Sequence, residues 1–263
     1  MTRKKLINIV MECRELFLQG YHTDKRVQYK GTVDLVTEYD VAIEKRLGKS
    51  LQEAFPDFEI IGEESAKEIT YPKKAIYIDP IDGTTNFIHS LPFCAISVGI
   101  WEEGRAIAGV VYNPVLDECF SAERGGGAFL NEKRIYVSKQ HDFQQSLIVT
   151  GFPYTKVTKG EDYEWVLRTM ANLLPVTRDI RRTGSASIDL CYVACGKFEA
   201  YYECNLKPWD VAAGILIVEE AHGKVSNEKG EEYVLGEHII LSSNAFVHNE
   251  LLKNIRTEQK LLD

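Results

Sequence analysis

Apolar residues recur at helical spacing in several segments of this chain, and each such segment predicts an amphipathic helix. Between residues 4 and 19 the apolar positions run from Leu6 to Phe17, and Gly20 is expected to end the helix. Residues 41–54 carry the same pattern behind Asp40, which is expected to cap them. Later helices are expected at 161–174, from Gly184 or Ser185 to about Cys195, from Pro208 to about His222, and at 246–256.

Short runs of apolar and β-branched residues predict strands between these helices. The runs at 58–61 and 75–78 are each followed by carboxylates. Residues 94–138 show alternating segments separated by turn signals, among them Glu103-Gly104 and Gly125-Gly126-Gly127, so we expect an antiparallel meander there. Further strands are expected at 146–150, 176–180, 198–202 and 239–242.

This order of elements predicts an α/β protein built from two packed halves. The first, residues 1–140, is an α+β half with an antiparallel sheet, and the second, residues 141–263, is an α/β half. The formal charge of −8 and the pI of about 5.4 argue against direct binding to nucleic acid or to an anionic membrane. They do not argue against a phosphate substrate, because bound divalent cations would invert the local field.

Other features of the sequence exclude several classes of protein. No apolar run approaches transmembrane length, and the basic N-terminus is followed by an amphipathic segment without a signal-peptide core, so a cytoplasmic protein is expected. The six cysteines form no CxxC pair and no Cys/His zinc spacing, and they are expected to be reduced, mostly buried thiols. The histidines form no HxxxH or HExxH pattern, which argues against a zinc hydrolase.

Candidate chemistry gathers where the expected strand 75–78 ends. Asp79 and Asp82 lie three positions apart around Pro80, and Gly83 then permits a tight turn before Thr84-Thr85 opens a helix. The backbone N–H groups of Gly83, Thr84 and Thr85 would attract an anion, above all phosphate. Two carboxylates beside such a turn suggest Mg²⁺ between protein and phosphate, whereas either dipeptide alone would indicate only a capped turn with solvated acids.

Four motifs in order resemble the inositol monophosphatase family of Mg²⁺-dependent, lithium-sensitive sugar phosphatases, in its bacterial form. They are Asp34-Leu35-Val36-Thr37 with Asp40, Gly62-Glu63-Glu64-Ser65, the block from Asp79 to Thr85, and Trp209-Asp210-Val211-Ala212-Ala213-Gly214. The resemblance extends over nearly the whole chain. It implies an αβαβα layered sandwich, the fold shared with fructose-1,6-bisphosphatase, and a homodimer.

The resemblance also implies a metal-dependent reaction. One Mg²⁺ would take Glu63, Asp79 and the Ile81 carbonyl, and another would take Asp79, Asp82 and Asp210, with two or three ions in all. A metal-activated water would attack a phosphate monoester, oriented by Thr84 with Asp40 or Glu63 behind it. Glu64 is a neighbour without an assigned role. Taken alone, Asp40 and Asp210 would be helix caps and the two glutamates a solvated surface pair.

Substrate contacts follow from the same resemblance. Besides the phosphate contacts of Gly83, Thr84 and Thr85, Gly184 and Ser185 would line the pocket with Asp210. Glu203, seven residues before Asp210, would accept a hydrogen bond from a sugar hydroxyl, although it could instead pair with a nearby cation. Lys207, where some animal members have histidine, is expected at the rim.

The leading hypothesis is hydrolysis of inositol 1-phosphate, a small phosphorylated polyol, to inositol and phosphate. Fructose-1,6-bisphosphatase, histidinol-phosphatase, NADP phosphatase and 3′-phosphoadenosine nucleotide phosphatase activities remain alternatives on the same fold. An alternative of another class is a regulatory or scaffold partner of the transcription machinery, although the complete ligand set favours retained catalysis.

Overall fold

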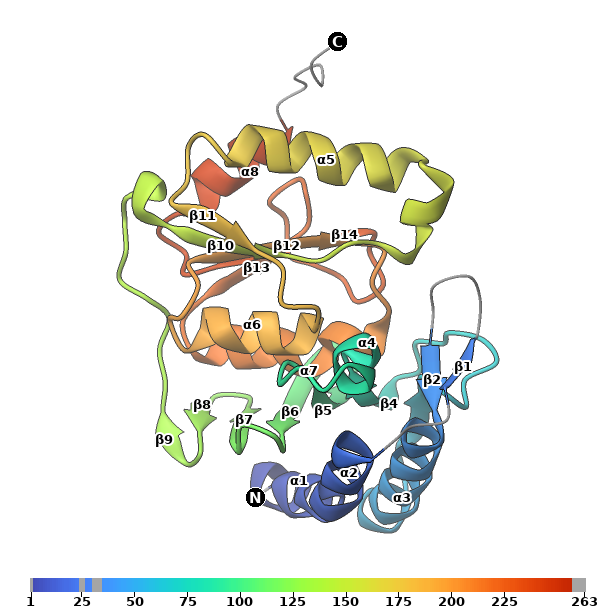
Figure 1. Ribbon diagram of the computed structural model, residues 1–263. Coiled ribbons are helices and arrows are strands. Elements are labelled where there is room, and N and C mark those ends of the chain that lie inside the picture. Colours follow the sequence, from blue (N-terminus) through green and yellow to red (C-terminus); the bar gives the residue numbers. More distant parts are fainter. Residues whose placement is uncertain (1, 24–26, 30–34, 257–263) are drawn as a thin grey trace.

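The computed structural model describes residues 2–23, 27–29 and 35–256, so Asp34 of the expected N-terminal motif lies outside the described residues. These residues form five layers in the order helices, sheet, helices, sheet, helices (Figure 1). The layered α/β sandwich expected from the sequence is therefore confirmed.

A seven-stranded sheet forms the lower of the two sheet layers in Figure 1. Its strands follow one another in chain order, parallel between the first two and antiparallel afterwards, which confirms the expected meander. The strands are β3 (Glu59–Gly62), β4 (Lys74–Asp82), β5 (Ala95–Glu102), β6 (Arg105–Asn113), β7 (Glu118–Glu123), β8 (Gly127–Leu130) and β9 (Lys133–Arg134). Its outer face is covered by α1 (Thr2–Met11), α2 (Arg14–His22) and α3 (Glu38–Ala54).

A five-stranded sheet forms the other sheet layer, in the order β11-β10-β12-β14-β13. β10 runs parallel to β11 and β12, while β14 is antiparallel to both of its neighbours. The strands are β10 (Leu147–Thr150), β11 (Asp179–Arg181), β12 (Ala200–Cys204), β13 (Lys224–Ser226) and β14 (Ile239–Ser243). Its outer face carries α5 (Glu161–Leu173) and α8 (His248–Arg256) (Figure 1).

The middle layer consists of α6 (Ala186–Ala194) and α7 (Pro208–Glu220), which lie between the two sheets (Figure 1). Both are apolar around nearly their whole circumference, as helices covered on two sides must be. α7 lies directly on the larger sheet, because a Cβ at Gly99 would stand 2.7 Å from Ala212 and one at Gly109 would stand 2.9 Å from Ala213. The second half of the chain thus packs onto the sheet of the first.

Small elements complete the fold. They are β1 (Val27–Tyr29), β2 (Leu35–Thr37), α4 (Thr84–Ile88), η1 (Phe143–Gln145) and η2 (Tyr154–Thr158), of which only α4 was expected from the sequence. The expected junction near residue 140 falls in the coil between β9 and η1.

Two expectations about the N-terminal helices are wrong. The segment expected as one helix is two, α1 and α2, and Gly20 lies inside α2 rather than at its end. Glycine is needed there for packing, since a Cβ would stand 2.5 Å from the ring of Tyr39 and 2.7 Å from that of Phe87. The cap of α3 is Thr37, and Asp40 is the third residue of the helix, where its side chain accepts the Thr37 N–H to complete a capping box.

Candidate active site

The end of β4 places two carboxylates in one pocket. The sequence predicted that this strand would end before Pro80, but it continues to Asp82 through a bulge. Asp79 pairs with Ser97, and Asp82 pairs with Ala95. Proline is tolerated there because the bulge needs no N–H at that position. The Asp79 carboxylate accepts the Ile81 N–H at 3.0 Å, and both aspartates line the pocket together with Ile81.

Gly83 makes the turn that brings α4 to this pocket. Its φ of +87° is strained for any other residue, and a Cβ would stand 2.7 Å from the carbonyl of Phe93. Thr84 follows at the first position of α4, and its hydroxyl donates to the Ile81 carbonyl at 3.0 Å. The same hydroxyl lies 3.4 Å from Oδ1 of Asp40, so the structure brings together Thr84 and Asp40, two of the residues expected to orient the attacking water.

Glu63 reaches the pocket from the end of β3. Its N–H donates to the Ile78 carbonyl at 3.1 Å and continues the pairing with β4. The next N–H, that of Glu64, donates to the buried carboxylate of Glu44 at 2.7 Å. Glu44 fits only because residue 62 is glycine, since a Cβ there would stand 2.3 Å from its carboxyl carbon. The chain is therefore held on both sides of Glu63, which lines the pocket.

Asp210 closes the pocket from the second half of the chain. It is the third residue of α7, after Pro208, and its carboxylate accepts the Lys207 N–H at 2.7 Å. Its role as a helix cap and its position in the pocket thus coexist. Lys207 lies at the exposed edge of the same pocket. Every expected metal ligand lines this one cavity: Glu63, Asp79, Ile81, Asp82 and Asp210.

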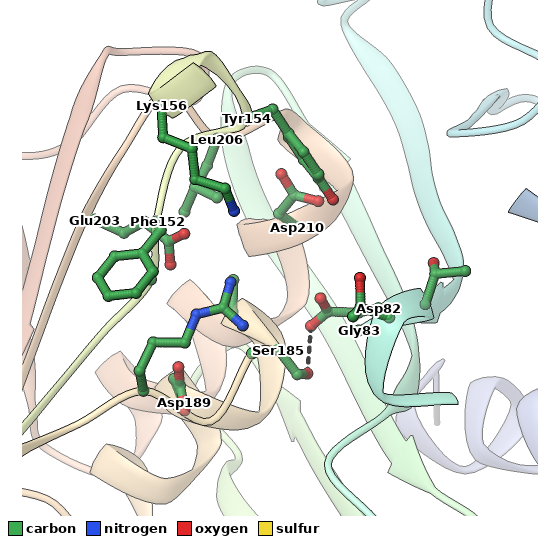
Figure 2. A pocket seen from close by; sticks show the side chains of 16 residues that line it. Asp82, Gly83, Phe152, Tyr154, Lys156, Ser185, Asp189, Glu203, Leu206 and Asp210 are labelled. Atoms are coloured by element: carbon green, nitrogen blue, oxygen red, sulfur yellow. Dashed lines mark hydrogen bonds between the residues drawn. The ribbon is translucent and has the colours of Figure 1, made fainter. Parts of the chain in front are cut away.

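A second pocket adjoins the first and shares Asp82, Gly83, Thr84 and Asp210 with it (Figure 2). Its wall includes Ser185, the N-cap of α6, whose hydroxyl donates to Asp82 at 2.7 Å. The amide of Asn86 in α4 donates to the Thr183 carbonyl at 2.9 Å and so fixes the loop before α6 against α4. Gly184, expected in this wall, is present with a φ of +97°.

Glu203 points into this second pocket from within β12 (Figure 2). Its carboxylate accepts the Tyr201 hydroxyl at 2.7 Å and lies directly over Gly151, where a Cβ would stand 1.8 Å from Oε1. Burial raises the pKa of Glu203 to about 7, against the opposing effects of the Tyr201 hydrogen bond and the charge of Arg182. It is therefore a carboxylate poised between its two protonation states near neutral pH.

A family model for the inositol monophosphatase family matches residues 3–260. The chain belongs to the inositol monophosphatase family. Its expected membership is thereby confirmed, and it is a member of a phosphatase superfamily.

Individual members of the inositol monophosphatase family match the chain over nearly all its length. Inositol monophosphatase 2 of Solanum lycopersicum is 37% identical over 263 residues, covering 96% of this chain and 97% of the relative. Nus factor SuhB of Pasteurella multocida is 38% identical over 254 residues, which cover 95% of this chain and 94% of that relative. The crystal structure of extragenic suppressor protein suhB from Bartonella henselae has a TM-score of 0.90 at 34% identity, and the match covers 97% of this chain and 98% of that chain. No helix within the described residues is long and apolar enough to cross a membrane.

The acidic groups of this family member repel one another. Burial raises the pKa of Asp79 well above its ordinary value, and the charges of Glu63, Asp82 and Asp210 raise it further. The pKa of Asp210 is raised in the same way, by burial and then by Glu63 and Asp82. For Asp82 burial also raises the pKa, while hydrogen bonds from Ser187 and Ser185 oppose the shift. Divalent cations would relieve this repulsion, and an all-oxygen donor set suits Mg²⁺.

The described carboxylates of this pocket do not form a tight group of three. Within the described residues, the group of three whose ligand atoms lie within 4.8 Å of one another is a different one, Asp162, Cys204 and His238. The acids of the pocket are therefore spread more widely than the shell of a single ion.

Among the residues of the second pocket that the sequence did not predict, three are charged: Lys156, Arg182 and Asp189. Lys156 lies in η2, a short element without a periodic signal, and its amine reaches into the pocket in Figure 2. Arg182 directly precedes the expected Gly184-Ser185 segment, a position that could have drawn attention to it. Asp189 is buried beneath the pocket and accepts the Thr183 hydroxyl.

Proposed function

We propose that the protein is a Mg²⁺-dependent phosphate monoester hydrolase that acts on small polyol phosphates, with inositol 1-phosphate as the preferred substrate. The observation that carries the proposal is the shared wall of the two pockets. Asp82, Gly83, Thr84 and Asp210 line both pockets. One pocket contains the expected metal ligands, and the other contains Glu203 and the positively charged side chains of Lys156 and Arg182. A phosphate at the shared wall would contact metal on one side while its alcohol portion lies against Glu203.

The residues have separate tasks in this proposal. Mg²⁺ held by Glu63, Asp79, the Ile81 carbonyl, Asp82 and Asp210 would activate water and stabilise the leaving alkoxide. The Ile81 carbonyl has a second lone pair for an ion beside the hydrogen bond from Thr84.

The remaining groups handle the proton and the substrate. Thr84, 3.4 Å from Asp40, orients the attacking water, and Asp40 or Glu63 accepts its proton. The N–H groups of Gly83, Thr84 and Thr85 hold phosphoryl oxygens, and Gly184 and Ser185 line the same pocket beside Gly83.

A substrate screen tests this function. Phosphate release should require Mg²⁺, and kcat/KM should be highest for inositol 1-phosphate among five substrates: inositol 1-phosphate, fructose 1,6-bisphosphate, histidinol phosphate, NADP and 3′-phosphoadenosine 5′-phosphate. A higher kcat/KM for one of the others would reassign the substrate. Failure to release phosphate from any of them would overturn the proposed activity. We further propose that the protein is cytoplasmic and forms a homodimer. Sedimentation at several protein concentrations tests the dimer.

A second role is supported by one observation, the 38% identity to a relative named Nus factor SuhB. As a protein partner of the transcription machinery, this chain would bind RNA polymerase complexes through its surface rather than through the acidic pocket. Binding of purified polymerase should then be equal for the wild type and for Asp82→Asn. Absence of binding by both proteins would remove this candidate without affecting the hydrolase proposal.

A further inference from the structure

A mixed group of metal-binding side chains lies outside the active site, at the end of the five-stranded sheet where α5 begins (Figure 1). It consists of Asp162 in the first turn of α5, Cys204 at the end of β12 and His238 just before β14. One ligand atom from each residue lies within 4.8 Å of those from the other two. Three elements that are distant in sequence therefore converge on one point.

The backbone holds these residues in place. Cys204 pairs with Ile239 across β12 and β14, and the N–H of Asn205 donates to the carbonyl of His238 at 2.7 Å. Nε2 of His238 is 2.7 Å from Oδ1 of Asp162. The side chain of His238 is 58% exposed and that of Asp162 is 14% exposed, while Cys204 is buried. The group is thus open to solvent on the histidine side and closed on the cysteine side.

We propose that Asp162, Cys204 and His238 bind a thiophilic divalent cation of the Zn²⁺ class, with water completing the coordination. Sulfur, imidazole nitrogen and carboxylate oxygen are the ligands that Zn²⁺ takes in proteins, and they do not suit Mg²⁺. Ligand atoms around one tetrahedral Zn²⁺ lie about 3.2–3.8 Å apart, so the 2.7 Å contact between His238 and Asp162 would have to widen to admit the ion, which the exposed side chain of His238 allows.

The charges of the proposed site also balance. A dication with one thiolate, one carboxylate and one neutral imidazole has no net charge, which suits a partly buried position. Binding would release the Cys204 thiol proton to solvent and replace the contact between Nε2 of His238 and Oδ1 of Asp162, while the ion gains bonds to the sulfur, an imidazole nitrogen and a carboxylate oxygen.

The proposed site is connected to the pocket of the proposed phosphatase. The Thr155 hydroxyl donates to Oδ2 of Asp162 at 2.5 Å, and Thr155 belongs to η2, which also carries the pocket residues Tyr154 and Lys156. Cys204 directly follows Glu203 in β12. An ion on Asp162 would therefore restrict η2, the element that carries the Lys156 amine over the pocket.

Titration with Co²⁺, a spectroscopic substitute for Zn²⁺, tests the site directly. The full-length protein is kept in saturating Mg²⁺ so that oxygen-only sites are filled. We expect a thiolate-to-cobalt charge-transfer band at one Co²⁺ per chain, together with the strong visible bands of a tetrahedral ion, and loss of both when Zn²⁺ is added. Absence of the charge-transfer band in the wild type would overturn the proposal.

Three variants assign the ligands. Cys204→Ser should abolish the charge-transfer band, and His238→Gln, at an exposed position, should weaken Co²⁺ binding by more than about tenfold. Cys195→Ser is the matched control, because this partly exposed cysteine at the end of α6 is outside the group, and it should leave the band unchanged. If Cys204→Ser does not fold, His238→Gln decides. A band that survives in His238→Gln at wild-type affinity, or is lost in Cys195→Ser, contradicts the assignment.

Hydrogen exchange separates a coupled site from an isolated one. Zn²⁺ should slow amide exchange in residues 154–158 of the wild type and leave it unchanged in His238→Gln. Equal exchange with and without Zn²⁺ in the wild type would overturn the connection to the pocket. Neither readout depends on phosphatase activity, so both remain decisive if the proposed substrate is wrong.

Discussion

The hydroxyl of Ser185 donates a hydrogen bond of 2.7 Å to Oδ2 of Asp82 and joins the start of α6 to the end of β4 across 103 positions of the chain. The same oxygen accepts the N–H of Ser187 at 2.7 Å. An expected metal ligand of the first half is therefore oriented by an expected substrate-wall residue of the second. The two expected sites are parts of one hydrogen-bonded unit.

Ser185→Ala should weaken the metal site without emptying it. One of the two hydrogen bonds to Oδ2 of Asp82 would remain, while the loss of a bond to a charged group costs about 1.5–3 kcal/mol. We expect the Mg²⁺ concentration for half-maximal activity to rise by roughly tenfold to a hundredfold. The control is Ser242→Ala, a buried serine whose hydroxyl has no partner within the described residues. Equal Mg²⁺ requirements for wild type and Ser185→Ala would contradict the orienting role.

Asp82→Asn and Asp210→Asn should each remove nearly all phosphatase activity. Both acids are proposed ligands of the same ion, so either substitution would cost that ion a charged oxygen. Without Mg²⁺ the melting temperature of each variant should equal or exceed that of the wild type, because one member of a repelling cluster is neutralised. The exposed Asp57→Asn serves as the control. Normal turnover by either pocket variant would refute the two-ion arrangement.

Glu203→Gln should lower kcat/KM for inositol 1-phosphate by roughly tenfold to a hundredfold, the effect of losing a hydrogen bond to a charged acceptor. Hydrolysis of an aryl phosphate, which offers no sugar hydroxyl, should be nearly unchanged. Because the pKa of Glu203 is raised to about 7, the wild-type kcat/KM should also rise with pH through neutrality and the variant should lack this step.

The comparison with Lys207→Ala distinguishes recognition from general support of the site. Lys207 lies at the rim, so its removal should affect a bisphosphate more than a monophosphate. A Glu203→Gln variant that slows every substrate by the same factor would show that Glu203 does not recognise the sugar.

Lithium should inhibit the enzyme by replacing the ion next to Asp82 and Asp210, as the family resemblance implies. Inhibition should weaken as Mg²⁺ is raised if the two ions compete for one site. The measurement is phosphate release over a matrix of Li⁺ and Mg²⁺ concentrations, with Na⁺ at equal ionic strength as the control. Full activity in Li⁺ that stops another member of the family would count against this assignment.

His248 should make the fold sensitive to mild acid. The side chain is buried between the hydroxyls of Ser226 and Ser243, at 2.8 and 2.9 Å, and burial, followed by the charge of Lys224, lowers its pKa from 6.5 to about 4. Between these two values the unfolded chain binds the proton and the folded chain does not. Stability should therefore fall as pH drops from 6.5 to 4, by at most about 3 kcal/mol from this group.

The contribution of His248 to the pH dependence of stability is obtained by comparing the wild type with His248→Asn. Urea unfolding at pH 7 and at pH 5 should show a smaller pH effect for His248→Asn than for the wild type. The buried aspartates shift stability in the opposite direction, but they do so equally in both proteins and cancel in the comparison. His141→Gln, at an exposed position, is the control. An unchanged pH effect in His248→Asn would contradict the buried neutral histidine.

Local chemistry explains what the sequence could predict. The turn at Gly83, the N-cap Ser185 and the Pro208 start of α7 each depend on the conformational preference of a few adjacent residues, so motif and position could be inferred together. The meander was predictable for the same reason, because its turns are short and its pairs consecutive.

Non-local contacts explain what it could not predict. The extension of β4 to Asp82 depends on pairing with Ala95, and Gly20 continues a helix because two distant rings cover it. Lys156 enters the pocket from a short 3₁₀ segment with no periodicity, and Glu203 can point inward only because Gly151 lies beneath it. None of these relationships leaves a signal within a window of adjacent residues.

The placement of α7 between the two sheets also has a consequence for biosynthesis. The helix rests on Gly99 and Gly109 of one sheet, and it carries Asp210, which emerges from the ribosome well after Asp79 and Asp82. A nascent chain that ends before residue 210 exposes the apolar face of the larger sheet and holds an incomplete set of proposed ligands. Completion of this ligand set thus coincides with coverage of that face, so the proposed hydrolytic activity would arise only in a chain that has also buried this apolar surface.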